Sequence, residues 1–415
     1  MAGPRLPNLA WRNLWRNRRR TLITLFSIAF GTLLAVVSTG LGDASYAEMI
    51  DYASRLGGGH VVLQHEDYAD HPSLKSTVVA DEATLRAIRD RPEVRAVVSR
   101  VSGGLMLATS SNNVGAMVLG VDPRREDETT LGLVESLVEG EMFAEPDDKG
   151  IILGATLAEN LDLEMGKKVV YTITDKSGEI TSGLARVSGI IETGTTEFDA
   201  NMCLLPIDSL REVLGYGPDE ATQIAVFVDN HRKAEALAAS LSEQLGDREV
   251  ALPWFEALPD LAGFVAMKEG GNVVLQAIIT VLIAAGIFNT LFVSVMERMR
   301  EFGILAAIGF SSRQLFALVL WESLWVGLCG IAAGILLTAW PYYYLSTTGL
   351  DITAMSGGAQ TQVAGVTMAP IMYIGLYPPH ALVIAGAILL ATLTAGLYPA
   401  YKAGRVVPVE AIRSA

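Results

Sequence analysis

Four long apolar runs divide the chain into segments suited to a lipid bilayer and segments suited to water. Each run is close to the ~20 apolar residues that a helix needs to cross the hydrocarbon core. The predicted membrane-spanning helices cover residues 21–42, 272–295, 315–340 and 380–398. A cleaved signal peptide is the alternative for the first run, since Ala44 to Ala47 could form a cleavage site. The length of that run favours an uncleaved helix.

Residues 43–270 follow a different pattern, in which stretches typical of strands alternate with amphipathic helical stretches. Strands are expected at 60–64, 94–101, 114–121, 151–153, 168–174, 184–193 and 223–228, and helices at 81–90, 207–215 and 232–245. We therefore predict an α-helical membrane protein with four transmembrane helices and a large α+β domain inserted between the first and second. Within that domain, residues from about 108 to 218 form a β-rich insertion.

The distribution of charge indicates which way the helices cross the membrane. Residues 43–269 carry 40 acidic and 19 basic residues, whereas the first twenty residues contain six arginines and no acid. Because basic residues flank the cytoplasmic ends of membrane helices, both termini are expected in the cytoplasm. The acidic domain and the loop 341–379 then lie on the other side. Residues 1–20 are expected to form an interfacial helix that contacts membrane lipid, and 399–415 a cytoplasmic tail.

Residues 296–314 join the second and third membrane helices through a short polar turn, so the two helices form a hairpin. Glu297, Arg298, Arg300 and Glu301 supply charges, and a small-residue helix follows them. A turn held in place by two helices suits the docking of a partner protein. A merely solvated turn is the alternative.

Little in the sequence predicts catalysis. The phosphate-binding pattern GxxxxGK(S/T) does not occur, so any ATP and Mg²⁺ that the protein uses must bind a partner subunit, and no cofactor is expected on this chain. The five histidines lack metal-binding spacing, and Cys203 and Cys329 define no disulfide framework. We expect a non-enzymatic protein that binds neither metal nor nucleic acid.

Glu322 is the one Asp, Glu, Lys or Arg side chain within the predicted membrane helices. A carboxylate at such a depth is usually paired or functional, and Arg298 or Arg300 is the expected partner. Anchoring at the lipid headgroups is the alternative. In the same helix, Gly330 and Gly334 form a small-xxx-small pattern typical of close helix packing.

The loop 341–379 is rich in tyrosine and methionine. These residues are Tyr342, Tyr343, Tyr344, Met355, Met368, Met372, Tyr373 and Tyr377. An aromatic belt at the membrane surface is one interpretation, and an apolar vestibule for a lipid-bearing substrate is the other.

Two stretches resemble the FtsX-like, MacB-type ABC permeases. They read E-R-M-R-E-F-G-I-L-A-A-I-G-F-S-S-R-Q-L followed by W-E-S-L, and, near the end of the chain, L-Y-P-A-Y-K-A-G-R-V-V-P-V-E-A-I-R. The opening A-W-R-N-L-W-R-N-R-R-R-T-L-I-T is also similar to the start of that family. One span, a large outer domain and three further spans are the family order, so the resemblance covers the whole chain.

The resemblance implies a permease moved by two copies of a separate ATPase subunit and completed by a second permease copy or a paralogue. The size of the outer domain resembles that of MacB-type and of lipoprotein-releasing (Lol) permeases. G-H-V-V-L-Q after the first span and the lack of an ATPase ahead of it are more similar to the Lol permeases. The implied function is ATP-driven extraction of lipoproteins from the bacterial inner membrane and their transfer to a periplasmic carrier. The alternatives are a MacB-like exporter of amphiphiles or peptides with a periplasmic adaptor, and an FtsX-like signalling permease that controls a cell-wall hydrolase.

The resemblance also implies roles for individual residues. Coupling to the ATPase is expected at Glu297, Arg298, Met299, Arg300, Glu301, Phe302, Gly303, Ile304, Leu305, Gly309 and Glu410. Within this set, Phe302 is expected to be an apolar anchor for the partner. A lipoprotein path between the first and second spans implicates Phe30, Leu34, Val37, Val274, Ile278 and Ile279.

Overall fold

The computed structural model describes residues 6–69, 73–246, 248–351 and 371–407, together with two short strands at 362–363 and 366–367. The chain divides into two compact units. The helical unit comprises residues 1–45, 267–352 and 371–415, and the β-rich unit comprises residues 46–266 and 353–370. Two helices, α2 and α9, continue from one unit into the other.

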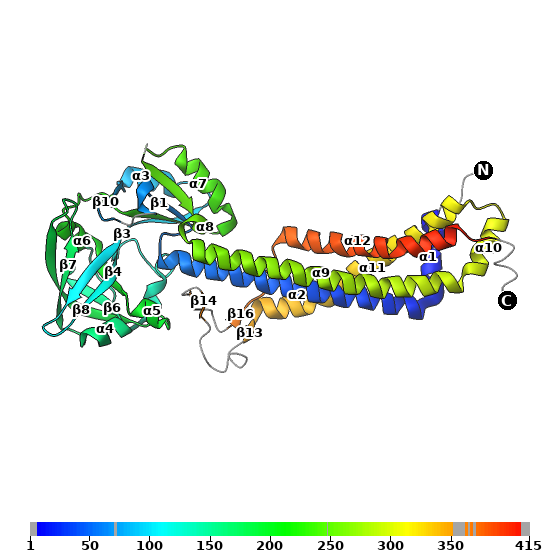
Figure 1. Ribbon diagram of the computed structural model, residues 1–415, viewed down its shortest axis with the longest axis horizontal. Helices are drawn as coiled ribbons and strands as arrows, with labels where there is room; N and C mark the ends of the chain where they lie inside the picture. The colour runs from blue at the N-terminus through cyan, green and yellow to red at the C-terminus, as the bar shows by residue number, and fades with distance from the viewer. Residues whose placement is uncertain are drawn as a thin grey trace. The chain divides into compact units, whose positions relative to one another are not determined.

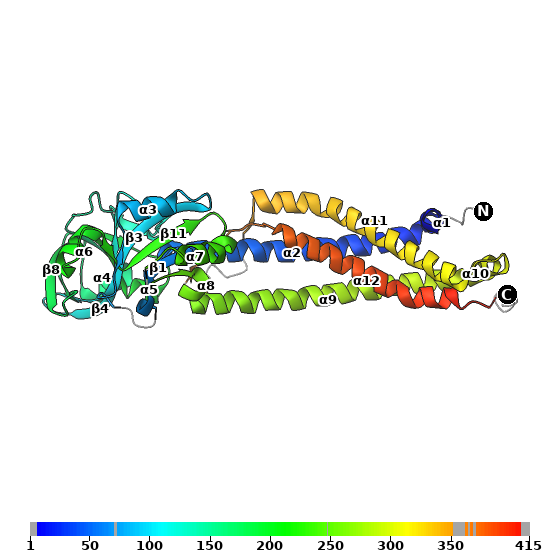
Figure 2. The same ribbon diagram turned by 90° about the horizontal axis from the view of Figure 1, so that it is seen from above.

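The helical unit is built on four long helices. Its helices are α1 (Leu6–Leu14), η1 (Trp15–Asn17), α2 (Arg18–Leu56), α9 (Pro259–Glu297), α10 (Met299–Ala307), α11 (Ser312–Thr347) and α12 (Pro378–Gly404). Both views show α2, α9, α11 and α12 side by side in this unit (Figures 1 and 2). In the described part of the chain, these four are long and apolar enough to cross a membrane, and they contain the four predicted spans.

Small residues set how closely these helices approach. A Cβ atom on Gly330 of α11 would lie 2.6 Å from Ile28 of α2, and one on Gly334 would lie 2.6 Å from Thr32. Such distances are shorter than a normal contact, so only glycine lets α11 lie this close to α2. Gln276 of α9 donates a hydrogen bond to Thr39 Oγ1 of α2 at 2.7 Å. The two glycine contacts lie where the small-xxx-small pattern predicts close helix packing.

All four long helices are longer than the apolar runs that they contain. Helix α2 continues to Leu56 through a stretch without glycine or proline, and α9 begins at Pro259 although Gly270 and Gly271 lie between its extension and the apolar run. Helix α11 continues through Pro341 to Thr347. Tyr342, Tyr343 and Tyr344 therefore lie on this helix, although the sequence pattern predicts them in a loop. Met355 and Met368 lie outside the described residues.

The β-rich unit contains most of the strands. They are β1 (Val61–His65), β2 (Val78–Val79), β3 (Val94–Ala108), β4 (Asn113–Val121), β5 (Leu137–Gly140), β6 (Gly150–Gly154), β7 (Lys168–Thr174), β8 (Ile180–Ile191), β9 (Met202–Pro206), β10 (Glu220–Ala221), β11 (Gln223–Val228) and β12 (Glu249–Pro253). Its longer helices are α3 (Glu82–Arg89), α4 (Ala155–Leu161), α6 (Ile207–Leu214) and α7 (Ala234–Ser242). The remaining short pairs are β13 (Leu350–Asp351) with β16 (Ile371–Met372), in the helical unit, and β14 (Gln362–Val363) with β15 (Val366–Thr367).

One sheet joins the two ends of this unit to the insertion between them. Its strand order is β12-β1-β11-β3-β4-β9-β6-β8-β5, and β7 pairs with both β3 and β8. The strands β3, β4, β9, β6, β8 and β7 therefore close into a ring. Strand β3 belongs to both parts, since its first half pairs with β11 and its second half with β4 and β7.

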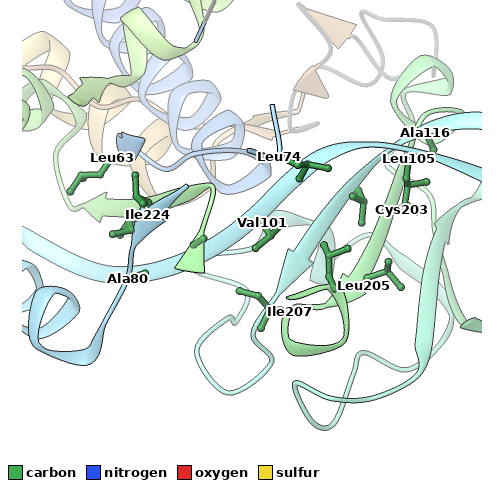
Figure 3. Close-up of a cluster of buried hydrophobic side chains, with 14 of the residues drawn as sticks. Leu63, Leu74, Ala80, Val101, Leu105, Ala116, Cys203, Leu205, Ile207 and Ile224 are labelled. Atoms are coloured by element: carbon green, nitrogen blue, oxygen red, sulfur yellow. The ribbon is translucent and has the colours of Figure 1, made fainter. Parts of the chain in front are cut away.

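The core of the β-rich unit lies along β3 and beneath the helices that follow the strands. Val101 and Leu105 of β3 lie in the same cluster as Cys203 and Leu205 of β9 (Figure 3). The second half of β3 alternates between buried and exposed residues with period 2, whereas β9 is buried along almost its whole length. The expected helices at 81–90, 207–215 and 232–245 correspond to α3, α6 and α7, whereas α4 escaped prediction because it is only two turns long.

His60 is a pH-sensitive group within this core. Burial lowers the pKa of its imidazole to about 4, although Asp51, 3.7 Å from Nε2, acts in the opposite direction. The unfolded chain binds a proton near pH 6.5, so the native state is most favoured above that pH. The contribution, up to roughly 3 kcal/mol, is lost as the pH falls from 6.5 towards 4.

We expect the unfolding temperature of the wild-type chain to fall more steeply over this pH range than that of His60→Gln. Thermal unfolding in detergent at a series of pH values measures the difference. His65→Gln is the matched control, because His65 is the nearest other histidine in the sequence, at the end of the strand β1 that His60 directly precedes. Parallel curves for the wild type and His60→Gln would contradict the expectation.

Candidate functional site at the turn between α9 and α11

A buried carboxylate organises the turn at one end of the helical unit. Glu322 of α11 is 6% exposed, accepts a hydrogen bond from Asn13 Nδ2 at 2.8 Å, and lies 3.1 Å from Arg298 Nη1. Asn13 belongs to α1, and Arg298 lies between α9 and α10. Three segments far apart in the sequence therefore meet at one carboxylate. Of the two arginines expected from the sequence, Arg298 is the partner, whereas Arg300 is exposed.

Further ion pairs join the start of the chain to the turn. Arg16 contacts Glu301, and Arg20 contacts Glu297 at 2.6 Å. Arg298 also contacts Glu301, at 3.2 Å. Each exposed pair contributes little to stability by itself. Their common effect is geometric, since Arg16 connects η1 to Glu301 of α10, and Arg20 connects the first turn of α2 to Glu297 at the end of α9.

These charges surround a polar cavity of about 330 Å³. Besides the charged residues, Asn17 and Thr24 line it from the start of the chain, and Thr290 and Ser294 line it from α9. Polar lining of this kind lets water reach the outer ion pairs, while Glu322 stays buried beneath them. If the pair between Glu322 and Arg298 is broken by removing Arg298, the Glu322 carboxylate is therefore left buried without water to solvate its charge.

Phe302 differs from the sequence expectation. Its side chain is fully buried in the cluster formed with Leu315 and Leu318 of α11, and Arg298 lies over its ring at 5.4 Å from the centroid. A buried ring cannot serve as an apolar anchor for a partner, so that expectation was wrong. The chain's own α11 is what Phe302 packs against.

The exposed apolar side chains of the turn are Ile304 and Ile308, at 49% and 71% exposure. Arg300 is exposed on the same short segment. Apolar side chains beside an arginine are typical of protein-binding surfaces. The segment Arg300–Ile308 thus carries an outward-facing apolar surface, here called the α10 surface and defined by Arg300, Ile304 and Ile308.

The remaining residues expected at the turn support its shape. Gly303 is buried, and Met299 and Leu305 pack against the Phe302 cluster. Gly309 has φ +105°, a conformation that side chains disfavour, and it ends α10 before Ser311 caps α11 through a capping box with Gln314. Glu410 lies outside the described residues.

The residues expected along a substrate path lie on α2 and α9. Phe30, Leu34, Val274 and Ile278 are exposed. Val37 and Ile279 are half-buried, and Ile279 packs on the core of the helical unit. The two helices touch where Ile283 fills the space above Gly31. Whether a substrate uses these exposed faces stays a prediction.

Sequence reasoning missed Asn13, Arg16 and Arg20. Their spacing of three and four residues places them on one face of a helix, which is the available signal. This signal is obscured by the other arginines of the same segment, which are Arg12, Arg18 and Arg19. Their partners also lie almost 300 residues away, so local pattern could not supply them.

Taken together, the helices and the β-rich unit define a multi-pass membrane protein with a large extracytoplasmic domain between its first and second spans. The model of the MacB-like periplasmic core domain matches residues 21–244, and that of the FtsX-like permease C-terminal matches residues 273–408. The chain belongs to this family of ABC-transporter permeases, and both matches cover permease domains.

The relatives carry several printed names. The chain is 25% identical to the macrolide export ATP-binding/permease protein MacB of Nitrobacter winogradskyi, over 95% of this chain and 58% of that protein. It is 19% identical to the lipoprotein-releasing system transmembrane protein LolE of Haemophilus influenzae, over 98% of both chains. It is 24% identical to LolC of Xylella fastidiosa, over 72% of this chain and 73% of that one. The chain thus spans less than two thirds of the MacB relative.

Two solved structures are similar to parts of the chain. One is the extracellular domain of the transporter YknZ from Gram-positive bacteria, with 14% identity, 46% of this chain and 98% of that chain covered, and a TM-score of 0.33. The other is the periplasmic region of MacB from Actinobacillus actinomycetemcomitans, with 13% identity, 50% and 94% coverage and a TM-score of 0.36.

Proposed function

We propose that this permease works with a separate cytoplasmic ATPase and extracts lipoproteins from the outer leaflet of the bacterial inner membrane. The observation that carries the coupling is the braced turn, which exposes the α10 surface while Glu322 and the arginine–glutamate pairs hold it to α1, α2 and α11. The lipoprotein substrate is supported by the similarity to LolE over 98% of both chains.

In this proposal, two ATPase subunits bind ATP and Mg²⁺, close on each other, and press on the turns of two paired permeases. The partner permease is a second copy or a paralogue. Because Arg16 of η1 and Arg20 of the adjoining α2 both pair with the turn, a displaced turn moves α2 along with it. Both termini are cytoplasmic in this arrangement and the β-rich unit is periplasmic, where it passes the lipoprotein to a soluble carrier.

External energy is needed because of the lipid anchor. Each buried methylene contributes about 0.8 kcal/mol to membrane attachment, so a protein with several acyl chains does not leave the bilayer spontaneously. The exposed apolar faces of α2 and α9, which include Phe30, Leu34 and Ile278, suit contact with acyl chains. We propose these faces as the lateral entry for the substrate.

A second candidate is export of amphiphiles or peptides through a periplasmic adaptor. It is supported by the 25% identity to MacB over 95% of this chain. An FtsX-like role in cell-wall control is a third, non-transport possibility within the same family.

Depletion of the protein in its host distinguishes these functions. Lipoprotein release predicts that labelled outer-membrane lipoproteins accumulate at least severalfold in the inner-membrane fraction, with unchanged tolerance to antibiotics. Altered drug or peptide tolerance with normal lipoprotein sorting would instead support the exporter. Filamentous cells with neither defect would support the cell-wall role and contradict transport.

A further inference from the structure

Three arginines bond three consecutive backbone carbonyls in the β-rich unit. Arg55 donates to the carbonyl of Glu128 at 2.9 Å, Arg95 to that of Thr129 at 2.9 Å, and Arg100 to that of Thr130 at 2.7 Å. Arg55 is on the last turn of α2, and the other two are on β3. We call this set of three arginines and three carbonyls the arginine clasp.

Arg100 is the centre of the clasp and is fully buried. Its Nε and Nη2 each lie 2.8 Å from a carboxylate oxygen of Glu126, in a bidentate pair. Its Nη1 donates to the carbonyl of Gly57, just beyond the end of α2. The last carbonyls of a helix lack partners within the helix and carry partial negative charge. A buried guanidinium therefore holds the end of α2 by both hydrogen bonding and charge.

The position of Arg100 on β3 is also special. Arg100 pairs with Gln223 at the end of the β11 ladder, and the next residue, Val101, begins the β4 ladder by pairing with Gly120. The side chain therefore starts from the point where the strand passes from one part of the sheet to the other. The end of α2, the outer part of the sheet and the ring of strands meet there.

The clasp is balanced in charge. Glu126 compensates Arg100, and Asp51 lies 3.0 Å from Arg55 and 3.3 Å from Arg95. Glu135, 3.7 Å from Arg55, is the third carboxylate. Balanced pairs of this kind often contribute little net stability compared with apolar side chains of similar volume. What such pairs do provide is a defined orientation. A planar guanidinium that makes several hydrogen bonds fixes the angle between the groups that it joins.

We propose that the arginine clasp is a rigid joint that fixes the end of α2 to both parts of the extracytoplasmic domain, with Arg100 as its positioning residue. A displacement of α2 then turns the domain as one body. The purpose of the joint rests on the proposed function, since only a permease driven from the cytoplasm needs to pass motion along α2. The rigidity itself follows from the contacts and can be measured without transport.

The test uses the full-length chain in lipid nanodiscs with Cys203 and Cys329 replaced by alanine. Spin labels are placed at exposed positions Glu48 on α2 and Lys168 on β7, which both belong to the β-rich unit. Pulsed electron–electron double resonance then gives the distribution of distances between the two spin labels. The parent should give one narrow distribution, and Arg100→Met/Glu126→Leu a distribution at least twice as wide.

Two further variants keep the test decisive. Arg100→Lys retains the charge and loses the planar fork, so it should broaden the distribution to an intermediate width even if the double variant folds poorly. Arg211→Met is the matched control, because Arg211 is a mostly buried arginine that bonds the backbone of Glu220 and does not contact α2. The proposed joint would be contradicted if both Arg100 variants left the width of the distance distribution unchanged. It would also be contradicted if Arg211→Met broadened the distribution equally.

A transport arm separates the joint from the proposed function. In proteoliposomes that contain the ATPase, Arg100→Met/Glu126→Leu should keep ATP hydrolysis within twofold of the parent and reduce lipoprotein release at least tenfold. Full release despite a widened distribution would overturn the joint's role in transmitting motion. Failure of the parent itself to release lipoprotein would contradict the proposed substrate and leave the distance measurement as the test of rigidity.

Discussion

Replacing Arg298 by methionine is expected to destabilise the helical unit strongly, because Glu322 would keep its burial and lose its cationic partner. Removing one member of a buried ion pair costs about 3–5 kcal/mol, since the remaining charge stays without compensation. Asn13 remains as a neutral donor and offsets only part of this cost. The unfolding midpoint in detergent should fall on the order of 10 °C.

The double variant Arg298→Met/Glu322→Leu isolates the pair. Once both charges are gone, most of the lost stability should return, and the double-mutant cycle should give a coupling energy of about 1–3 kcal/mol. Arg300→Met is the matched control, because Arg300 is a neighbouring arginine with an exposed side chain. Equal midpoints for Arg298→Met and Arg300→Met would show that the Glu322 pair does not hold the turn.

The variant Ile304→Asp/Ile308→Asp is expected to abolish binding of the ATPase while leaving the fold intact. Both side chains are exposed in this chain, and exposed substitutions usually change stability by less than about 0.5 kcal/mol. At an interface, a few apolar anchors carry most of the binding energy, and a buried unpaired carboxylate opposes association. Copurification with the ATPase should be lost, and stimulated ATP hydrolysis should fall at least tenfold.

Ile180→Asp is the control for this change. Ile180 is 76% exposed, but it lies on β8 of the β-rich unit, whereas the turn belongs to the helical unit. It should leave copurification and ATP hydrolysis unchanged. If Ile304→Asp/Ile308→Asp binds the ATPase as the wild type does, the α10 surface is not the docking point.

Much of the architecture follows from local pattern. The four long apolar runs become α2, α9, α11 and α12, the short apolar run 61–63 becomes part of β1, and the alternating stretch 168–174 becomes β7. Gly330 and Gly334 lie at a helix contact because small residues are the only ones that permit it. The family motifs point to the same turn that the structure braces. In each case the signal is contained within a few adjacent residues.

Other features depend on which distant residues meet. The burial of Phe302 could not be predicted, because an aromatic residue in a polar turn looks the same whether it faces a partner or its own α11. The same holds for Arg100, which reads as an ordinary strand residue in an alternating pattern. Its burial becomes visible only when α2 and the segment that contains Glu126 close over β3.

By itself, the sequence determined the number of spans, the insertion of an α+β domain after the first of them, and the family. These follow from apolar length, strand periodicity and short motifs, which are local quantities. Only the tertiary structure decided that Glu322 pairs with Arg298 and Asn13, that the β12-β1-β11 part of the sheet shares β3 with the ring, and that Arg100 clasps α2. A buried charge needs a partner, but which residue becomes the partner depends on how the helices and strands pack. That packing results from many weak contacts distributed over the whole chain.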